Sequence, residues 1–161
     1  HKPVFFVRGN HAASVEYSQT AQRTEPWGAT DLHRKLVHHK GLIIAGFEGS
    51  LRYRTGPFMY TQAEMWGMVL AMLPRLLYNC LRHGRALDVL VTHAPAWGLG
   101  DREDKAHQGF KAFRWLLQVF RPRLHLYGHI HLYDRGEPAV QQFGPTQLVN
   151  AFGYQEISLN E

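Results

Sequence analysis

Short apolar runs alternate with amphipathic segments through the middle of this 161-residue chain, and this alternation limits its fold more than any other feature. Buried strands are predicted at residues 42–45, 87–91 and 124–127, because each is a brief apolar run bounded by glycine or polar residues. Between them, apolar residues recur every three or four positions at 61–82 and 108–120, the spacing of an amphipathic helix. Strands separated by helices form parallel or mixed sheets, so we expect an α/β fold.

Less regular patterns predict the outer elements. An apolar run at 3–7 predicts a first strand. Thr30 is a good helix-capping residue and predicts a helix over 31–39. Two closing strands are expected at 147–150 and 154–159.

Composition is that of an ordinary globular protein, with 45% apolar and 19% charged residues. No repeat or linker interrupts residues 1–161, which we expect to form a single domain.

The net charge of +5 favours polyanionic partners such as nucleotides, with nucleic acid as a further candidate. No apolar stretch reaches the roughly 20 residues of a membrane span. Cys80, the only cysteine, allows no internal disulfide, so we expect a reducing, cytoplasmic location.

Three polar clusters each follow a predicted strand. Asn10 and His11 stand in Gly-Asn-His, His93 in Thr-His-Ala-Pro, and His129 and His131 in Gly-His-Ile-His. Functional groups gather at the carboxyl ends of strands in α/β sheets, so we expect the three clusters to meet. Imidazole nitrogens and an amide oxygen suit Mn, Fe or Zn better than Mg or Ca.

In this order, the three clusters resemble the downstream motifs of the calcineurin-like metallophosphoesterase family, and the resemblance extends over nearly the whole chain. It implies a four-layer αββα sandwich of two mixed sheets and a centre of two divalent metal ions. In that centre, Asn10, His93 and His129 would bind one metal and His131 the other. His11 would face the phosphate as the catalytic residue. The implied reaction is attack of a metal-bound hydroxide on the phosphorus of a phosphomonoester or phosphodiester.

Two features depart from the family pattern. The family begins with Asp-x-His and Gly-Asp motifs, and the residues before Asn10 contain neither. The chain also begins at His1 rather than at methionine, so we expect an N-terminally incomplete domain whose first strands are missing. Ala12 stands where the family has an acidic residue, which leaves His11 without that partner in the sequence.

Alternatives follow from these departures. One is a non-catalytic binding module that has lost the dinuclear centre. Another is a single structural metal held by Asn10, His93 and His129. For the enzyme, we expect a phosphorylated small molecule or a nucleotide-like substrate; the sequence does not indicate which one, which metal, or which oligomeric state. His107 is interpreted either as a residue bordering the substrate or as ordinary surface, and His125 as a packing residue.

Overall fold

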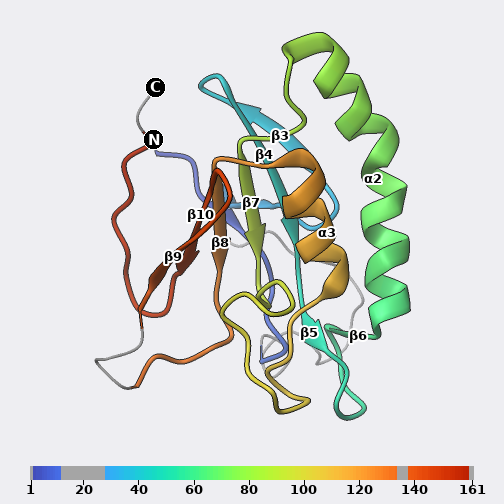
Figure 1. Ribbon diagram of the computed structural model, residues 1–161, viewed down its shortest axis with the longest axis vertical. Helices are drawn as coiled ribbons and strands as arrows, with labels where there is room; N and C mark the ends of the chain where they lie inside the picture. The colour runs from blue at the N-terminus through green and yellow to red at the C-terminus, as the bar shows by residue number, and fades with distance from the viewer. Residues whose placement is uncertain (1, 12–27, 134–137, 160–161) are drawn as a thin grey trace.

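The computed structural model describes residues 2–11, 28–133 and 138–159. A six-stranded mixed sheet forms its centre, with two helices on one face (Figure 1). The strands are β1 (Phe5–Phe6), β2 (Thr30–Asp31), β3 (Leu36–His39), β4 (Leu42–Phe47), β5 (Ser50–Leu51), β6 (Met59–Tyr60), β7 (Val89–Thr92), β8 (Leu124–Tyr127), β9 (Val140–Phe143) and β10 (Thr146–Asn150). The helices are α2 (Gln62–His83) and α3 (Lys111–Phe120). The predicted α/β fold with a mixed sheet is confirmed.

The six strands lie in the order β3-β4-β7-β8-β10-β9. The four central strands are parallel, and the edge strands β3 and β9 are antiparallel to their neighbours. Phe47 pairs with Thr92, Thr92 with Tyr127, and Tyr127 with Asn150. The carboxyl ends of the parallel strands are therefore level, and the residues that follow them emerge at one edge of the sheet.

Residues on the parallel strands alternate between two apolar layers, as the twofold period of a strand requires. One layer lies under α2 and α3 and includes Phe47, Leu90 and Phe113, which are fully buried. The opposite layer is centred on Ile44 and Val149. Among the described residues, those packed against this second layer come from the N-terminal segment, the C-terminal tail and the strands themselves.

Helix α2 begins and ends where its local sequence predicts. The hydroxyl of Thr61 accepts a hydrogen bond from the Glu64 amide, and the Glu64 carboxylate accepts one from the Thr61 amide, which forms a capping box. Gly84 ends the helix with a φ of 72°. The helix is one continuous element through Pro74. No helix in the described ranges is long and apolar enough to cross a membrane.

Two predictions for the outer elements are wrong. Residues 31–39 do not form a helix, because Leu36–His39 pair with β4 as an antiparallel hairpin. The turn of this hairpin has positive φ at Lys40 and Gly41, as the tightest hairpin turns require. Residues 154–159 form no strand either. The antiparallel partner of β10 is instead Val140–Phe143.

Candidate metal centre

Three of the predicted ligands meet beyond the carboxyl ends of the strands. The Nε2 atom of His93 lies 3.0 Å from Oδ1 of Asn10 and 3.1 Å from Nδ1 of His129. Asn10 follows the β1 segment, His93 follows β7, and His129 follows β8. We call these three residues the ligand trio. Its atoms come from segments more than thirty residues apart. The level ends of β7 and β8 bring His93 and His129 together, and the Gly49 amide, just after β4, donates to the Arg8 carbonyl and so ties the Asn10 segment to the same edge.

Backbone hydrogen bonds hold the two histidine turns at this edge. The His93 amide donates to the Phe47 carbonyl at 3.1 Å, and the Gly128 amide donates to the His93 carbonyl at 3.0 Å. His129 itself has a φ of 66°, in the left-handed region that non-glycine residues seldom adopt. The side-chain amide of Asn150 donates to the Ile130 carbonyl at 2.8 Å and so supports the same turn.

Gly9 leaves room for the His93 ring. A Cβ atom at this position would lie 2.5 Å from Cε1 and 2.9 Å from Nε2 of His93. Both distances are shorter than any tolerated carbon contact, and the ring would have to move. The glycine of Gly-Asn-His is therefore required by close packing of an imidazole on the backbone.

Electrostatics keep the trio's imidazoles neutral. Burial, followed by the nearby His129, His11 and His131, lowers the pKa of His93 from 6.5 to about 3. Burial is also the main cause that lowers the pKa of His129. Neutral imidazoles retain the lone pair that a metal ion requires.

The loop after β7 selects the tautomer of His129. Nε2 of His129 lies 2.8 Å from the carbonyl oxygen of Ala106, and since a carbonyl only accepts, this nitrogen carries the hydrogen. The lone pair of the neutral ring is then on Nδ1, which faces His93. Asp101 folds the loop by accepting from the amides of Gly98 at 2.8 Å and Gly109 at 2.9 Å. A hydrogen-bonded outer partner of this kind is typical of metal-binding histidines.

The donor chemistry of the trio fits one divalent ion. A hydrogen on Nε2 of His93 cannot satisfy Oδ1 of Asn10 and Nδ1 of His129 with good geometry at the same time. A cation would accept all three lone pairs. In the described part of the chain, no group of three or more His, Cys, Asp or Glu residues is arranged to hold a metal. The trio falls outside this definition, because it contains two histidines and its third member is an asparagine.

The fourth predicted ligand, His131, contacts Tyr133 and Phe152 and forms no hydrogen bond to the trio among the described residues. Its Nδ1 lies 2.6 Å from the Tyr133 hydroxyl, and its ring stacks on Phe152 at 4.8 Å between centroids. The side chain is exposed, as is that of His11. Both lie close enough to contribute to the electrostatic field at His93.

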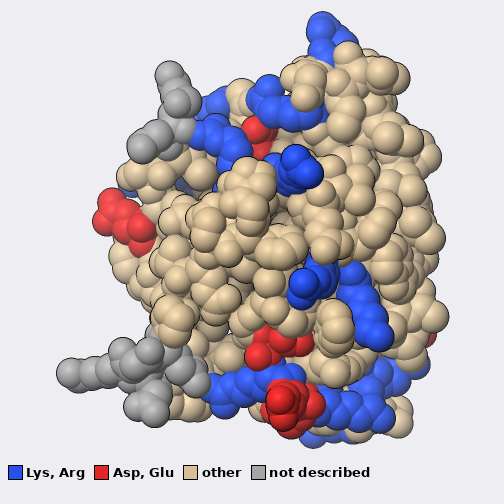
Figure 2. Space-filling view, in the orientation of Figure 1, with Lys and Arg blue, Asp and Glu red and all other residues tan. Residues whose placement is uncertain are grey.

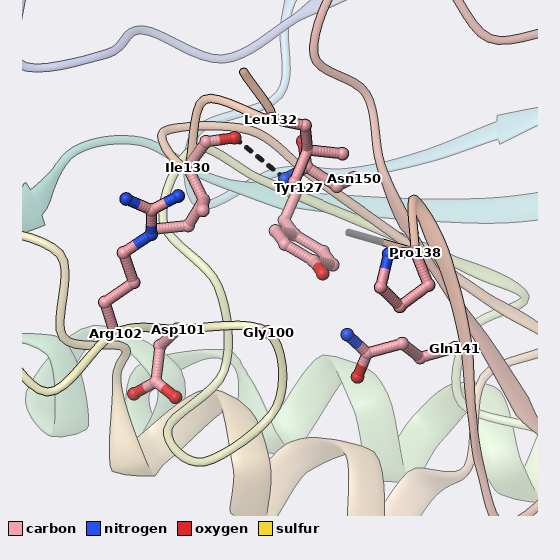
Figure 3. A pocket seen from close by; sticks show the side chains of 9 residues that line it. All are labelled: Gly100, Asp101, Arg102, Tyr127, Ile130, Leu132, Pro138, Gln141 and Asn150. Atoms are coloured by element: carbon pink, nitrogen blue, oxygen red, sulfur yellow. Dashed lines mark hydrogen bonds between the residues drawn. The ribbon is translucent and has the colours of Figure 1, made fainter. Parts of the chain in front are cut away.

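Beside the Ile130–His131 turn is a cavity of about 160 Å³, lined in part by Asp101, Arg102 and Asn150 (Figure 3). Arg102 donates to the His131 carbonyl at 3.2 Å, and Figure 3 draws the bond from Asn150 to Ile130. These residues support the turn from outside the ligand trio.

The structure also places His107, interpreted from sequence as a surface or substrate-bordering residue, and His125, interpreted as a packing residue. His107 lies in the loop after β7, with its ring 5.3 Å from that of His129, and its Nδ1 is 2.9 Å from the Asp104 carboxylate. It therefore borders the trio. His125 is fully buried in β8, as expected for a packing residue. Sequence reasoning missed the Ala106 carbonyl and Tyr53, whose hydroxyl lies 3.5 Å from Nδ2 of Asn10.

Known proteins resemble this chain in sequence and in fold. The sequence model of the calcineurin-like phosphoesterase family matches residues 1–133. A solved crystal structure superposes with a TM-score of 0.59 at 20% identity, covering 92% of this chain and 56% of its own. The crystal structure of TT1561 from Thermus thermophilus has a TM-score of 0.49 at 15% identity, with coverages of 76% and 49%. The chain thus spans about half the length of these solved proteins. Among curated proteins, none matches.

Proposed function

The chain belongs to the calcineurin-like phosphoesterase family, and on this premise we propose that it is part of a metal-dependent enzyme that hydrolyses a phosphomonoester or phosphodiester. The observation that carries the proposal is the convergence of Oδ1 of Asn10 and Nδ1 of His129 on Nε2 of His93, at 3.0 Å and 3.1 Å. Two neutral imidazoles and an amide oxygen suit a divalent ion such as Mn, Fe or Zn. When bound, such ions supply Lewis-acid charge and lower the pKa of water to near neutrality.

The protein's own residues have distinct roles in this proposal. Asn10, His93 and His129 hold one metal, and His131 contributes to a second. The Ala106 carbonyl keeps the hydrogen of His129 on Nε2, away from the metal. His11 is exposed and follows Asn10 directly, and in this proposal its imidazole donates a proton to the leaving oxygen of the substrate.

The test uses the natural full-length protein, with metal content measured by elemental analysis and hydrolysis of p-nitrophenyl phosphate and bis(p-nitrophenyl) phosphate followed by absorbance. We expect His129→Ala to lose metal and activity together. We expect His11→Ala to retain its metal and to lower kcat by about 100-fold or more, the usual contribution of a general acid. His38→Ala, on the exposed face of β3, is the control and should behave as wild type.

Unchanged metal content in His129→Ala would refute the ligand assignment. Loss of metal in His11→Ala would refute its role in proton transfer. Absence of hydrolysis by the metal-loaded wild-type protein with either ester would refute the enzymatic proposal itself.

A second candidate is a non-catalytic module with one metal or none. One observation favours it: His131 hydrogen-bonds to Tyr133 and stacks on Phe152, and it makes no hydrogen bond to the trio among the described residues. The same elemental analysis separates the two candidates. Two metals per chain support the enzyme, whereas a single metal without hydrolysis supports the module.

A further inference from the structure

The loop between β5 and β6 forms one wall of a cavity beside the ligand trio. This cavity, of about 380 Å³, is lined by Asn10, His11, Arg54, Pro57 and Met59, together with Thr55 and Gly56. We call it the Arg54 pocket. Because its lining includes a member of the trio and the exposed His11, it opens where a substrate would reach the metal centre.

The loop is attached to the segment that carries Asn10. The Gly49 amide donates to the Arg8 carbonyl at 2.8 Å, and the Ser50 amide donates to the Phe58 carbonyl at 3.0 Å. Gly49 has a φ of 83°, and a Cβ there would collide with the Phe58 carbonyl. The two ends of the loop are therefore held together beside the Gly-Asn-His segment.

Arg54 is held in place by an aromatic contact rather than by a carboxylate. Its guanidinium carbon lies 5.4 Å from the centroid of the Tyr53 ring. The hydroxyl of the same tyrosine lies 3.5 Å from Nδ2 of Asn10. One tyrosine thus connects the guanidinium to the ligand trio. A cation–π contact uses the face of the aromatic ring and leaves N–H groups of a guanidinium able to bind an anion.

Two neighbouring arginines in the loop differ in their partners. Arg52 donates to the Glu64 carboxylate at 2.9 Å and to the Met59 carbonyl at 3.1 Å, so its hydrogen bonds are internal. Arg54 is exposed and forms no ion pair among the described residues. Basic side chains gather at the lower end of the molecule in Figure 2, the end at which Figure 1 places β5 and β6. Arg54 is the arginine available to a ligand.

The lining of the pocket limits what it can accept. Among its described lining residues there is no carboxylate, and Pro57 and Met59 provide apolar surface next to the guanidinium of Arg54. Its volume is in the range of small-molecule sites, which is too small for a folded protein segment. The lining therefore matches a compact organic group that carries a negative charge.

We propose that the Arg54 pocket binds the part of the substrate that is not hydrolysed, and that Arg54 recognises a second anionic group on it. The substrate class is then a small phosphoester that bears a further carboxylate or phosphate. This inference rests on the proposed function, because it takes the trio as the site of the reacting phosphate. It adds a residue that determines specificity.

Equilibrium binding to the natural full-length protein loaded with Mn²⁺ tests this proposal without turnover. The probes are methylphosphonate and phosphonoacetate, which differ by one carboxylate and contain a carbon–phosphorus bond that resists hydrolysis. We expect wild type to bind phosphonoacetate about tenfold more tightly than methylphosphonate, because one charge-assisted hydrogen bond contributes about this much affinity. Arg54→Gln should abolish this preference, and Arg54→Lys should restore part of it. Arg52→Gln, which removes the same charge from the same loop, should keep it.

Equal affinity of wild type for the two probes would overturn the proposal, as would an equal loss in Arg52→Gln and Arg54→Gln. The outcomes also separate this inference from the enzymatic proposal. An Arg54-dependent preference without any phosphoester hydrolysis would leave the anion site standing and remove the enzyme. Phosphoester hydrolysis without a preference for phosphonoacetate would support the enzyme and refute the anion site at Arg54.

Discussion

Acid should destabilise the protein through the buried imidazole of His125. The Thr92 hydroxyl donates its single hydrogen to the Ala94 carbonyl at 2.6 Å, so it must accept from Nε2 of His125, 2.8 Å away. The other ring nitrogen, Nδ1, then carries a lone pair; it is buried and has no hydrogen-bond partner among the described residues. Protonation there would bury a charge, and this burial lowers the pKa of His125 from 6.5 to about 3.

The sign and size of the effect follow from proton linkage. Between pH 6.5 and about pH 3, the unfolded chain binds a proton at His125 that the folded protein does not. The stabilisation is therefore complete above pH 6.5 and is lost progressively as the pH falls toward 3. From pH 7.5 to pH 5, the free energy of unfolding should fall by about 2 kcal/mol through this residue alone.

The perturbation is His125→Gln, which keeps an N–H donor for Thr92 and cannot titrate. Urea unfolding of each protein is followed by tryptophan fluorescence at pH 7.5 and at pH 5. From pH 7.5 to pH 5, the free energy of unfolding of the variant should fall by about 2 kcal/mol less than that of wild type. Other histidines contribute equally to both proteins and cancel in this difference. His38→Gln, at an exposed position on β3, should lose as much as wild type.

An equal loss in His125→Gln and wild type would refute the reasoning, because the buried ring would then not be the group that the unfolded chain protonates. A smaller loss in His38→Gln would refute it as well, since the effect would then not depend on burial.

Two further predictions concern the site and the core. Gly9→Ala should displace the His93 ring, which lies 2.5 Å from the new Cβ, and weaken Mn²⁺ binding about tenfold or more in a titration. Gly67→Ala, whose Cβ meets nothing within 4 Å, is its control, and unchanged Mn²⁺ affinity in Gly9→Ala would contradict the close packing. Phe113→Ala should lower the free energy of unfolding by about 3–5 kcal/mol, because the side chain is fully buried. Val119→Ala, on the same helix but 50% exposed, should change it by less than about 0.5 kcal/mol, and equal losses in urea unfolding would contradict this account of the core.

Elements with local signals were predictable from sequence. The three-four spacing of apolar residues predicts a helix over 61–82, and α2 lies within one residue of these bounds. The structure adds the capping box of Thr61 and Glu64 at its start and Gly84 at its end. Strand β3 lacked such a signal, because residues 36–39 are strand only through their pairing with β4. Thr30 also resembles a helix cap, but its amide donates to the Val4 carbonyl and so forms part of a strand pair.

For the site, the sequence predicted the candidate ligands but not the residues that orient them. Residue type and position after a strand identify Asn10, His93 and His129. The level ends of the parallel strands β7 and β8 bring the two histidines together, whereas β1, which precedes Asn10, pairs with β2 in a separate two-stranded sheet. The partners that orient them left no signal in the sequence. The Ala106 carbonyl is a backbone group in an irregular loop, and its position near His129 depends on how Asp101 folds that loop.

The order of the strands also affects how the chain folds. Helix α2 separates the parallel neighbours β4 and β7 in the chain, as the pairing of Ile44 with Val89 illustrates, and helix α3 separates β7 and β8. Each pairing must close a long loop before any strand contact compensates for the lost chain entropy, and such non-local topologies fold slowly. Helices α2 and α3 depend on local contacts and are able to form earlier. The ligand trio joins three of the distant segments, so a metal ion would bind only after the sheet has assembled and would report the last steps of folding.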